Sequence, residues 1–409
     1  MTLYFHTGYT CISCGESSSV DPFHYTCEKC GSNLDAVFDY SGIKQNWSKK
    51  ILSKNPDPSI WRFLPLLPVS HKPQETSIQV GGTPLVNSTL LAQEMGIKSI
   101  WLKDDTRNPS GSLKDRATEV GIHHAKELGF DTVVAASTGN AAASLACLSA
   151  HHQMEAVIFT PSSAPPAKLT QILQYSAELF PVDGSYDEAF DLSMEVVNST
   201  GWYSRSTGIN PILSEGKKTV ALEIAEQLSW SVPDQVFVPV GDGCIIGGVY
   251  KGFYDLLQLG WIDHMPKIVA VQAEGSAAIE NALKNGNLIS VDADTIADSI
   301  SVDSPRDGQK ALRAVKKSNS YGLTVTDDEI LDAQHHLAKR TGIFAEPAAA
   351  ASFAGLIKSV NNGKITSDES AVLLITGTGL KDIPSAQKTV KIPSPILPEL
   401  QSFQDRFNG

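Results

Sequence analysis

From residue 80 onward, short apolar runs alternate with amphipathic segments long enough to form helices. Alternation of this kind predicts strands joined by crossover helices, and therefore a parallel sheet with helices on both faces. The fold class that we expect is α/β. The apolar runs are SIWLKDD (99–105), TVVAAS (132–137), AVIFTP (156–161), AELFPV (177–182), QVFVPV (235–240), KIVAVQAE (267–274) and AVLLITG (371–377).

Charge and hydropathy limit the partners of the chain. Its 409 residues include 33 Lys and Arg against 45 Asp and Glu, and the net charge of −12 argues against nucleic acid or an anionic membrane surface as the main partner. No apolar stretch approaches the ~18–20 residues of a membrane helix. The start, MTLYFHTGYTCISCG, lacks the pattern of a signal peptide. We therefore expect a cytoplasmic protein that acts on a small molecule.

Four cysteines near the N-terminus form two Cys-x-x-Cys pairs, each followed by glycine: Cys11, Cys14, Cys27 and Cys30. Two such pairs can present four thiolates to one tetrahedral Zn²⁺, although the loop between them is slightly shorter than usual. Two redox pairs, or unligated thiols in a reducing compartment, are the alternative. We expect residues 1–45 to form a zinc-ribbon-like module in which these four cysteines hold a structural zinc ion.

The segment NPSGSLKDRA, residues 108–117, places a lysine at the start of a predicted helix. Ser112 and Asp115 have the spacing of a capping box, which puts Lys114 in the first turn. A cation there is disfavoured by about 0.3–1 kcal/mol, because it meets the positive end of the helix dipole. That cost falls if the amine is a base of lowered pKa or is bonded to a cofactor, so Lys114 is a candidate catalytic residue.

Two strand ends carry signatures of anion binding. AASTGN joins the strand at 132–137 to a helix, and Ser137 and Thr138 add hydroxyl donors to the helix N-terminus, although the same residues also form an ordinary helix start. VPVGDGCIIGG, at 238–248, is rich in glycine, but Ile246 replaces the glycine that a dinucleotide fingerprint requires. The phosphate of another cofactor fits this loop better.

Three further expectations concern single residues. Asp242 lies inside the glycine loop, so its carboxylate must point away from a bound phosphate, for example to cap the following helix. In the small-residue segment IFAEPAAAASFAG, Glu346 is the one residue placed to face a site. Most of the histidines in the pairs at 123–124, 151–152 and 335–336 are expected to face solvent.

The order of these motifs resembles the tryptophan-synthase-like (fold type II) pyridoxal-phosphate-dependent enzymes over about residues 80–385, and it looks most like the threonine synthases within them. The resemblance implies that Lys114 is the Schiff-base lysine and that Asn140 contacts the cofactor's ring hydroxyl. Ser137 and Thr138 would bind the substrate carboxylate. Thr376, at the end of AVLLITG, would bond the pyridine nitrogen. The loop around the cofactor phosphate would consist of Gly241, Asp242, Gly243, Cys244 and Ile245.

The same resemblance implies two open parallel-sheet α/β domains after the cysteine module. Residues 46–110 together with 206–395 would form the large pyridoxal-phosphate-binding domain, and residues 111–205 the small one. Residues 396–409 would form a tail. The assembly that we expect is a homodimer.

Two reactions compete within this resemblance. A threonine synthase would convert O-phospho-L-homoserine and water to L-threonine and phosphate. Leu213 stands where these enzymes usually have a basic residue for the substrate phosphate, so Arg205, Lys217 and Arg306 are the cations available to replace it. A β-replacement or β-elimination enzyme acting on O-phosphoserine or serine would not need that charge. A scaffold without activity is disfavoured, because Lys114, Asn140 and Thr376 are all present.

Overall fold

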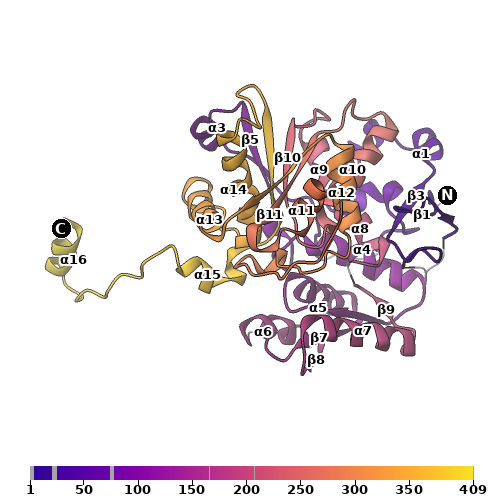
Figure 1. Cartoon of the computed structure of the whole chain (residues 1–409), viewed down its shortest axis with the longest axis horizontal. Coiled ribbons are helices and arrows are strands. Elements are labelled where there is room, and N and C mark those ends of the chain that lie inside the picture. The colour runs from indigo at the N-terminus through magenta and orange to yellow at the C-terminus, as the bar shows by residue number, and fades with distance from the viewer. Residues whose placement is uncertain (1–3, 21–24, 74–77, 165, 207, 409) are drawn as a thin grey trace.

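A computed structural model of the chain describes residues 4–20, 25–73, 78–164, 166–206 and 208–408, and three sheets organise it (Figure 1). The large sheet has the order β12-β11-β10-β13-β5-β4. Its strands are β4 (Leu85–Asn87), β5 (Ser99–Asp104), β10 (Gln235–Pro239), β11 (Lys267–Ala273), β12 (Gly322–Val325) and β13 (Ser370–Ile375). Neighbours are parallel except for β4, which runs antiparallel to β5, so the sheet is mixed rather than wholly parallel as predicted.

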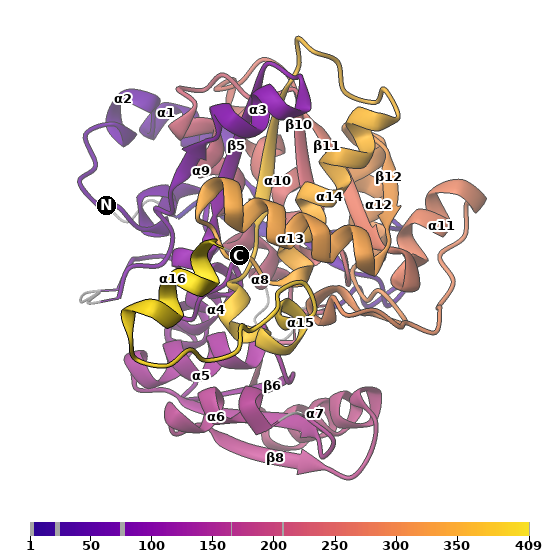
Figure 2. The same cartoon turned by 90° about the vertical axis from the view of Figure 1, so that its left-hand side faces the viewer.

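The smaller sheet is wholly parallel and has the order β8-β7-β6-β9. Its strands are β6 (Thr132–Ala136), β7 (Glu155–Pro161), β8 (Glu178–Val182) and β9 (Tyr203–Ser204). Every residue of β6 and β10 is buried, as is usual for parallel strands that are covered on both faces. Figure 2 shows the smaller sheet and its helices below the large sheet.

Helices complete both layers. Around the smaller sheet lie α4 (Lys114–Glu127), α5 (Asn140–His152), α6 (Pro166–Gln174) and α7 (Tyr186–Thr200). Around the large sheet lie α3 (Thr89–Met95), α8 (Pro211–Lys217), α9 (Thr219–Gln227), α10 (Cys244–Leu259), α11 (Ala278–Asn285), α12 (Gly308–Lys317), α13 (Asp327–Thr341) and α14 (Pro347–Asn361). A Cβ added to Gly248 of α10 would lie 2.8 Å from Cβ of Lys217, so glycine permits the close packing of α8 on α10.

Both chain ends lie outside these two layers. The N-terminal strands β1 (His6–Cys11), β2 (Ser17–Ser18) and β3 (Leu34–Phe38) form a three-stranded antiparallel sheet, with α1 (Tyr40–Asn46) and α2 (Lys49–Leu52) after it. After α15 (Ile383–Gln387) the chain extends away from the body and ends in α16 (Leu400–Asn408), as Figure 1 shows. No helix in the described ranges has the length and apolar character needed to span a membrane.

The predicted capping box is wrong. Helix α4 does begin at Lys114, but Asp115 accepts hydrogen bonds from the backbone N–H of Ser110 at 2.7 Å and from its hydroxyl at 2.5 Å. The hydroxyl of Ser112 is buried without a hydrogen-bond partner among the described residues. Gly111 has a φ of +79°, and this left-handed turn brings Ser110, not Ser112, back to Asp115.

The expectation that most of these histidines face solvent is also wrong, because three of the six are buried. His123, His124 and His152 are buried where α4 packs against α5 and β9. Nε2 of His152 lies 2.8 Å from the Glu119 carboxylate, which also accepts a hydrogen bond from the Trp61 indole at 3.0 Å. The pattern of apolar residues predicted that these positions are helical, but it did not predict that this face of α4 packs against α5 and is therefore buried.

Candidate active site

The predicted site residues line connected cavities beyond the carboxyl ends of β6, β10 and β13. One large cavity has a volume of about 420 Å³, and its wall includes Lys114, Ser137, Thr138, Asn140 and the loop Gly241, Asp242, Gly243, Cys244 and Ile245. A second cavity of about 240 Å³ shares Thr138 and Asn140 and includes Glu346. A small space between them touches Lys114, Asn140, Ile245 and Thr376. The fold therefore gathers residues that are far apart in the sequence.

Lys114 lies where α4 meets the end of β13. The backbone N–H of Leu113 donates to the carbonyl of Thr376 at 2.9 Å, which fixes the lysine beside that strand end. Burial lowers the pKa of Lys114 below that of free lysine, and the charge of Arg205 lowers it further, whereas Cys244, Glu346 and Asp242 oppose the decrease. An amine in these surroundings loses its proton more readily than a solvated lysine.

Asn140 is held by two side chains from the large-sheet side of the cavity. Its Nδ2 lies 2.9 Å from both carboxylate oxygens of Glu346 and donates to the Ser299 hydroxyl at 3.1 Å. Burial raises the pKa of Glu346, although Asn140, Lys381 and Lys114 favour its charged form. The sequence singled out Glu346 but not Ser299, which lies in a short 3₁₀ helix (Asp298–Ile300) without a recognisable motif.

The glycine loop has the form of an anion cradle. Gly243 adopts a φ of +93° and precedes α10, and a Cβ there would lie 2.6 Å from the carbonyl oxygen of Asp307. A Cβ on Gly241 would lie 2.9 Å from Cα of Ile300. Glycine is required at both positions, and the backbone at the start of α10 can approach a phosphate closely.

Asp242 does not cap α10, contrary to one expectation. Its Oδ1 accepts a hydrogen bond from the backbone N–H of Arg306 at 3.2 Å. The backbone of Asp242 is tied to the same segment, because its carbonyl accepts from the N–H of Asp307 at 2.9 Å. The carboxylate is thus used to anchor the segment 299–308 against the loop.

The three cations that the sequence offers for binding a substrate phosphate lie in different places. Arg205 and Arg306 line the large cavity. The guanidinium of Arg205 donates to Thr118 at 2.9 and 3.1 Å, and burial lowers its pKa to about 10. Arg306 lies over the ring of Phe190 and pairs with Asp187 at 2.7 Å, nearer the rim. Lys217 is fully buried and is absent from the residues that line the cavity.

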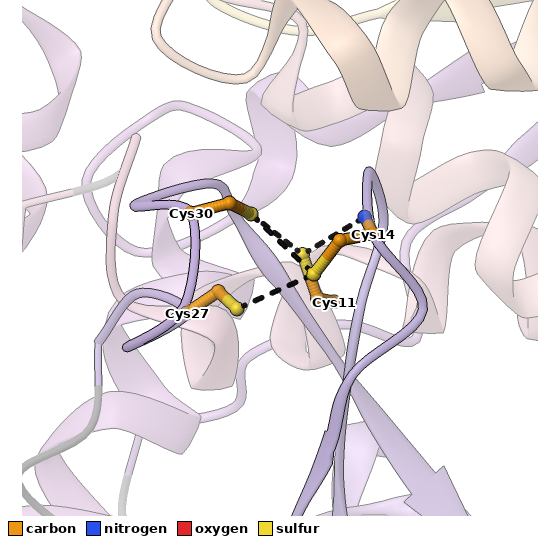
Figure 3. A group of neighbouring side chains, drawn as sticks. All are labelled: Cys11, Cys14, Cys27 and Cys30. Atoms are coloured by element: carbon orange, nitrogen blue, oxygen red, sulfur yellow. Dashed lines mark hydrogen bonds between the residues drawn. The ribbon is translucent and has the colours of Figure 1, made fainter.

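The four N-terminal cysteines converge on one point (Figure 3). The Sγ–Sγ distances are 3.5 Å for Cys11–Cys30, 3.7 Å for Cys14–Cys27 and 3.5 Å for Cys14–Cys30. Four thiolates around one zinc ion, with Zn–S bonds of about 2.3 Å, would be about 3.8 Å apart. Burial opposes ionisation of Cys11, but backbone N–H groups of Cys14 and Ser13 lower its pKa to about 6. The arrangement suits one tetrahedral ion.

Comparisons with known proteins identify the family of the chain. The family model described as "Pyridoxal-phosphate dependent enzyme" matches residues 76–377. The chain is 40% identical to threonine synthase of Methanocaldococcus jannaschii, over 94% of this chain and 96% of that protein. It is 39% identical to threonine synthase of Methanosarcina acetivorans, over 98% of each chain. Its identity to threonine synthase of Mycobacterium tuberculosis is 35%, over 81% of this chain and 90% of that one.

Solved structures show the same fold at lower identity. The processed form of threonine deaminase isoform 2 from Solanum lycopersicum has a TM-score of 0.66 at 22% identity and covers 75% of this chain and 82% of that one. Maize serine racemase has a TM-score of 0.65 at 23% identity and covers 75% of this chain and 91% of that one. At this identity the likeness concerns the fold alone.

Proposed function

This chain belongs to the threonine synthase family of pyridoxal-phosphate-dependent enzymes, and on that basis we propose that it converts O-phospho-L-homoserine and water to L-threonine and phosphate. It is thus a lyase of amino-acid biosynthesis that cleaves a carbon–oxygen bond. The observation that carries the proposal is the 40% identity to a threonine synthase over 94% of the chain. The meeting of Lys114, Asn140 and Thr376 around one space supports it.

The residues present fit pyridoxal phosphate. The cofactor supplies an electron sink for the electron pair that remains at Cα when a proton is removed. The loop at 241–245 would hold its phosphate, because Gly241 and Gly243 leave room for close approach of the backbone. Asn140 would meet the ring hydroxyl, and the hydroxyl of Thr376 would meet the pyridine nitrogen. A neutral hydroxyl at that position favours elimination over transamination.

The chain's own groups then bind the substrate and move its protons. Ser137, Thr138 and the N-terminus of α5 would bind the substrate carboxylate. The amine of Lys114 would take the proton from Cα and help to move one from Cβ, so that phosphate leaves Cγ. A proton is then restored at Cγ, water gives its hydroxyl to Cβ and releases its other proton, and the amine of Lys114 returns a proton to Cα, which gives threonine. Arg205 would supply positive charge toward the leaving phosphate, because this residue lines the cavity.

The proposal is tested by running the reaction in H₂¹⁸O. Addition of water at Cβ places one ¹⁸O atom in the hydroxyl of the threonine product, and cleavage of the Cγ–O bond leaves the released phosphate unlabelled. Unlabelled threonine, or no threonine, contradicts the proposed reaction. The competing β-replacement reaction on O-phosphoserine or serine is disfavoured, because the relatives at 34–40% identity over most of the chain carry the name threonine synthase.

Further parts of the proposal concern the assembly around this site. The convergence of Cys11, Cys14, Cys27 and Cys30 supports one structural zinc ion in the module of residues 1–45. The strands β4, β5 and β10 to β13 form the large sheet, and β6 to β9 form the smaller one. This division supports a large cofactor-binding domain of residues 46–110 and 206–395, a small domain of 111–205 and a tail of 396–409. We also propose a homodimer in the cytoplasm, where the six cysteines, none of which forms a disulfide bond, would stay reduced.

A further inference from the structure

Lys217 differs from the other buried lysines of the described chain. Five lysines there are less than 9% exposed: Lys103, Lys217, Lys218, Lys251 and Lys310. Four of them have a carboxylate within 4 Å: Lys103 pairs with Glu223 at 2.6 Å, Lys251 with Asp255 at 2.5 Å and Lys310 with Asp307 at 3.6 Å, and Lys218 pairs with both Glu215 and Asp255. Within the described residues, Nζ of Lys217 has only the carbonyl of Leu213, at 3.5 Å.

A buried ammonium without a counter-charge is costly, so a missing anion is the natural explanation. Burial lowers the pKa of Lys217 to about 7, and the charges of Arg205 and Lys114 lower it further, whereas Cys244 and Asp307 oppose the decrease. Asp307 faces this region from the start of α12, but its carboxylate is 3.6 Å from Lys310. At neutral pH the proton on Lys217 is therefore only marginally held unless an anion is nearby.

The position of Lys217 indicates which anion this is. Its Cβ packs against α10 at Gly248, one turn after Cys244 of the glycine loop. Lys217 thus lies behind the glycine loop and does not line the cavity into which a substrate would enter. The group that this loop is expected to hold is the phosphate of the cofactor. Position 213 on the same helix carries leucine, so it supplies no charge.

We propose that Lys217 is the buried counter-charge for the cofactor phosphate held by the loop Gly241 to Ile245. The ammonium raises the positive potential at the start of α10, adding to the helix dipole and the backbone N–H groups. It acts through the loop and is a positioning residue rather than a catalytic one. This inference rests on the proposed function only in taking pyridoxal phosphate as the cofactor.

The test compares pyridoxal phosphate with pyridoxal, which has the same ring and aldehyde but no phosphate. Dissociation constants of both are measured on the apoenzyme by absorbance, for wild type, Lys217→Met and Lys217→Arg. Lys284→Met, at an exposed lysine, is the matched control. We expect Lys217→Met to weaken binding of pyridoxal phosphate by at least about tenfold and binding of pyridoxal by less than about twofold. Lys217→Arg should retain most of the affinity, and Lys284→Met should resemble wild type.

A second readout needs neither turnover nor a folded apoenzyme variant. The ³¹P resonance of the cofactor phosphate is followed against pH in the holoenzymes of wild type and Lys217→Arg, and of Lys217→Met where it loads. A nearby ammonium should keep the phosphate dianionic to lower pH in wild type and Lys217→Arg than in free cofactor or in Lys217→Met.

Three outcomes would overturn the inference. Equal loss of affinity for pyridoxal phosphate and pyridoxal would show a merely structural role. A ³¹P titration in wild type identical to that of the free cofactor would place the charge elsewhere. A rise in KM for O-phosphohomoserine with unchanged cofactor affinity would assign Lys217 to the substrate phosphate. Because the binding experiments use no substrate, they stand even if the proposed reaction fails, whereas wild type that binds no pyridoxal phosphate contradicts both.

Discussion

Glu346 holds Asn140 with both carboxylate oxygens, each 2.9 Å from the amide nitrogen. Asn140 begins α5 beside the smaller sheet, and Glu346 precedes α14 beside the large sheet, so the contact spans the cavity between them. Because the amide nitrogen is committed to Glu346, the side-chain oxygen of Asn140 remains as the acceptor for a ring hydroxyl. Glu346 also adds negative charge near Lys114. This one carboxylate therefore both orients Asn140 and influences Lys114.

Replacing Glu346 tests this double role. Glu346→Gln keeps the size of the side chain but removes its charge, and we expect kcat to fall by about 10- to 100-fold. Without the carboxylate the pKa of Lys114 decreases further, so the acid limb of the kcat profile should shift to lower pH. Steady-state kinetics from pH 6 to 9 measure both effects. Glu195→Gln on the surface is the control, and wild-type kinetics in Glu346→Gln would contradict the role.

Lys114 is predicted to attach the cofactor. Wild-type protein treated with pyridoxal phosphate and borohydride should gain the mass of one reduced cofactor on the peptide that contains Lys114. Lys114→Ala should gain none at that peptide and should lose at least about 100-fold in kcat, because its base is gone. Peptide mass spectrometry makes the comparison, with Lys126→Ala as a control for labelling of other lysines. Labelling of a different lysine in wild type would remove Lys114 from its role.

His124 makes folding sensitive to acid. It is 5% exposed and lies 3.1 Å from the Tyr203 hydroxyl, and burial lowers its pKa from 6.5 to about 4. Because the unfolded chain takes up the proton near pH 6.5 and the folded chain only near pH 4, stability present above pH 6.5 is lost as the pH falls. Between pH 7 and pH 5 this residue alone should cost about 2 kcal/mol.

Urea unfolding of wild type and His124→Gln at pH 7 and pH 5 checks this value. Glutamine keeps a polar partner for Tyr203 but does not titrate, so the variant should lose less stability than wild type over the same interval. An equal loss in both proteins would show that other groups, such as His6 with a pKa near 3, account for the acid sensitivity.

Zinc removal is expected to affect the active site through the cysteine module. The hydroxyl of Tyr25 accepts from the backbone N–H of Ser204 at 3.1 Å, and the amide of Asn33 donates to the carbonyl of Gly208 at 2.5 Å. In the sequence, Tyr25 and Asn33 lie on either side of Cys27 and Cys30, and their partners Ser204 and Gly208 lie on either side of Arg205. We expect one zinc ion per chain in reduced protein and a several-fold higher KM for the phosphorylated substrate after chelation.

Metal analysis and kinetics before and after chelation measure both parts of this prediction. Cys30→Ser should reproduce the chelated protein, whereas Cys147→Ser should retain its metal. Protein that holds less than about half a zinc per chain when kept reduced would contradict the structural site. Full activity after complete removal of zinc would contradict the link to Arg205.

The residues predicted to form the site lie near one another because they follow strand ends, and the topology of a parallel sheet brings strand ends together. Lys114, Asn140, Thr376 and the glycine loop met as expected for that reason. Contacts that depend on a turn or on packing were not foreseen. Gly111 turned Ser110 rather than Ser112 to Asp115. That Lys217 has no carboxylate partner among the described residues can be recognised only once the positions of all neighbouring carboxylates are known.

The identity of the substrate can be tested by measuring product formation from two phospho-amino acids. Holoenzyme is mixed in parallel with O-phospho-L-homoserine and with O-phospho-L-serine, and phosphate, threonine and pyruvate are measured. We predict equal amounts of threonine and phosphate from O-phosphohomoserine, and little phosphate or pyruvate from O-phosphoserine. Release of phosphate from O-phosphoserine alone, without threonine from the other substrate, would contradict the assignment.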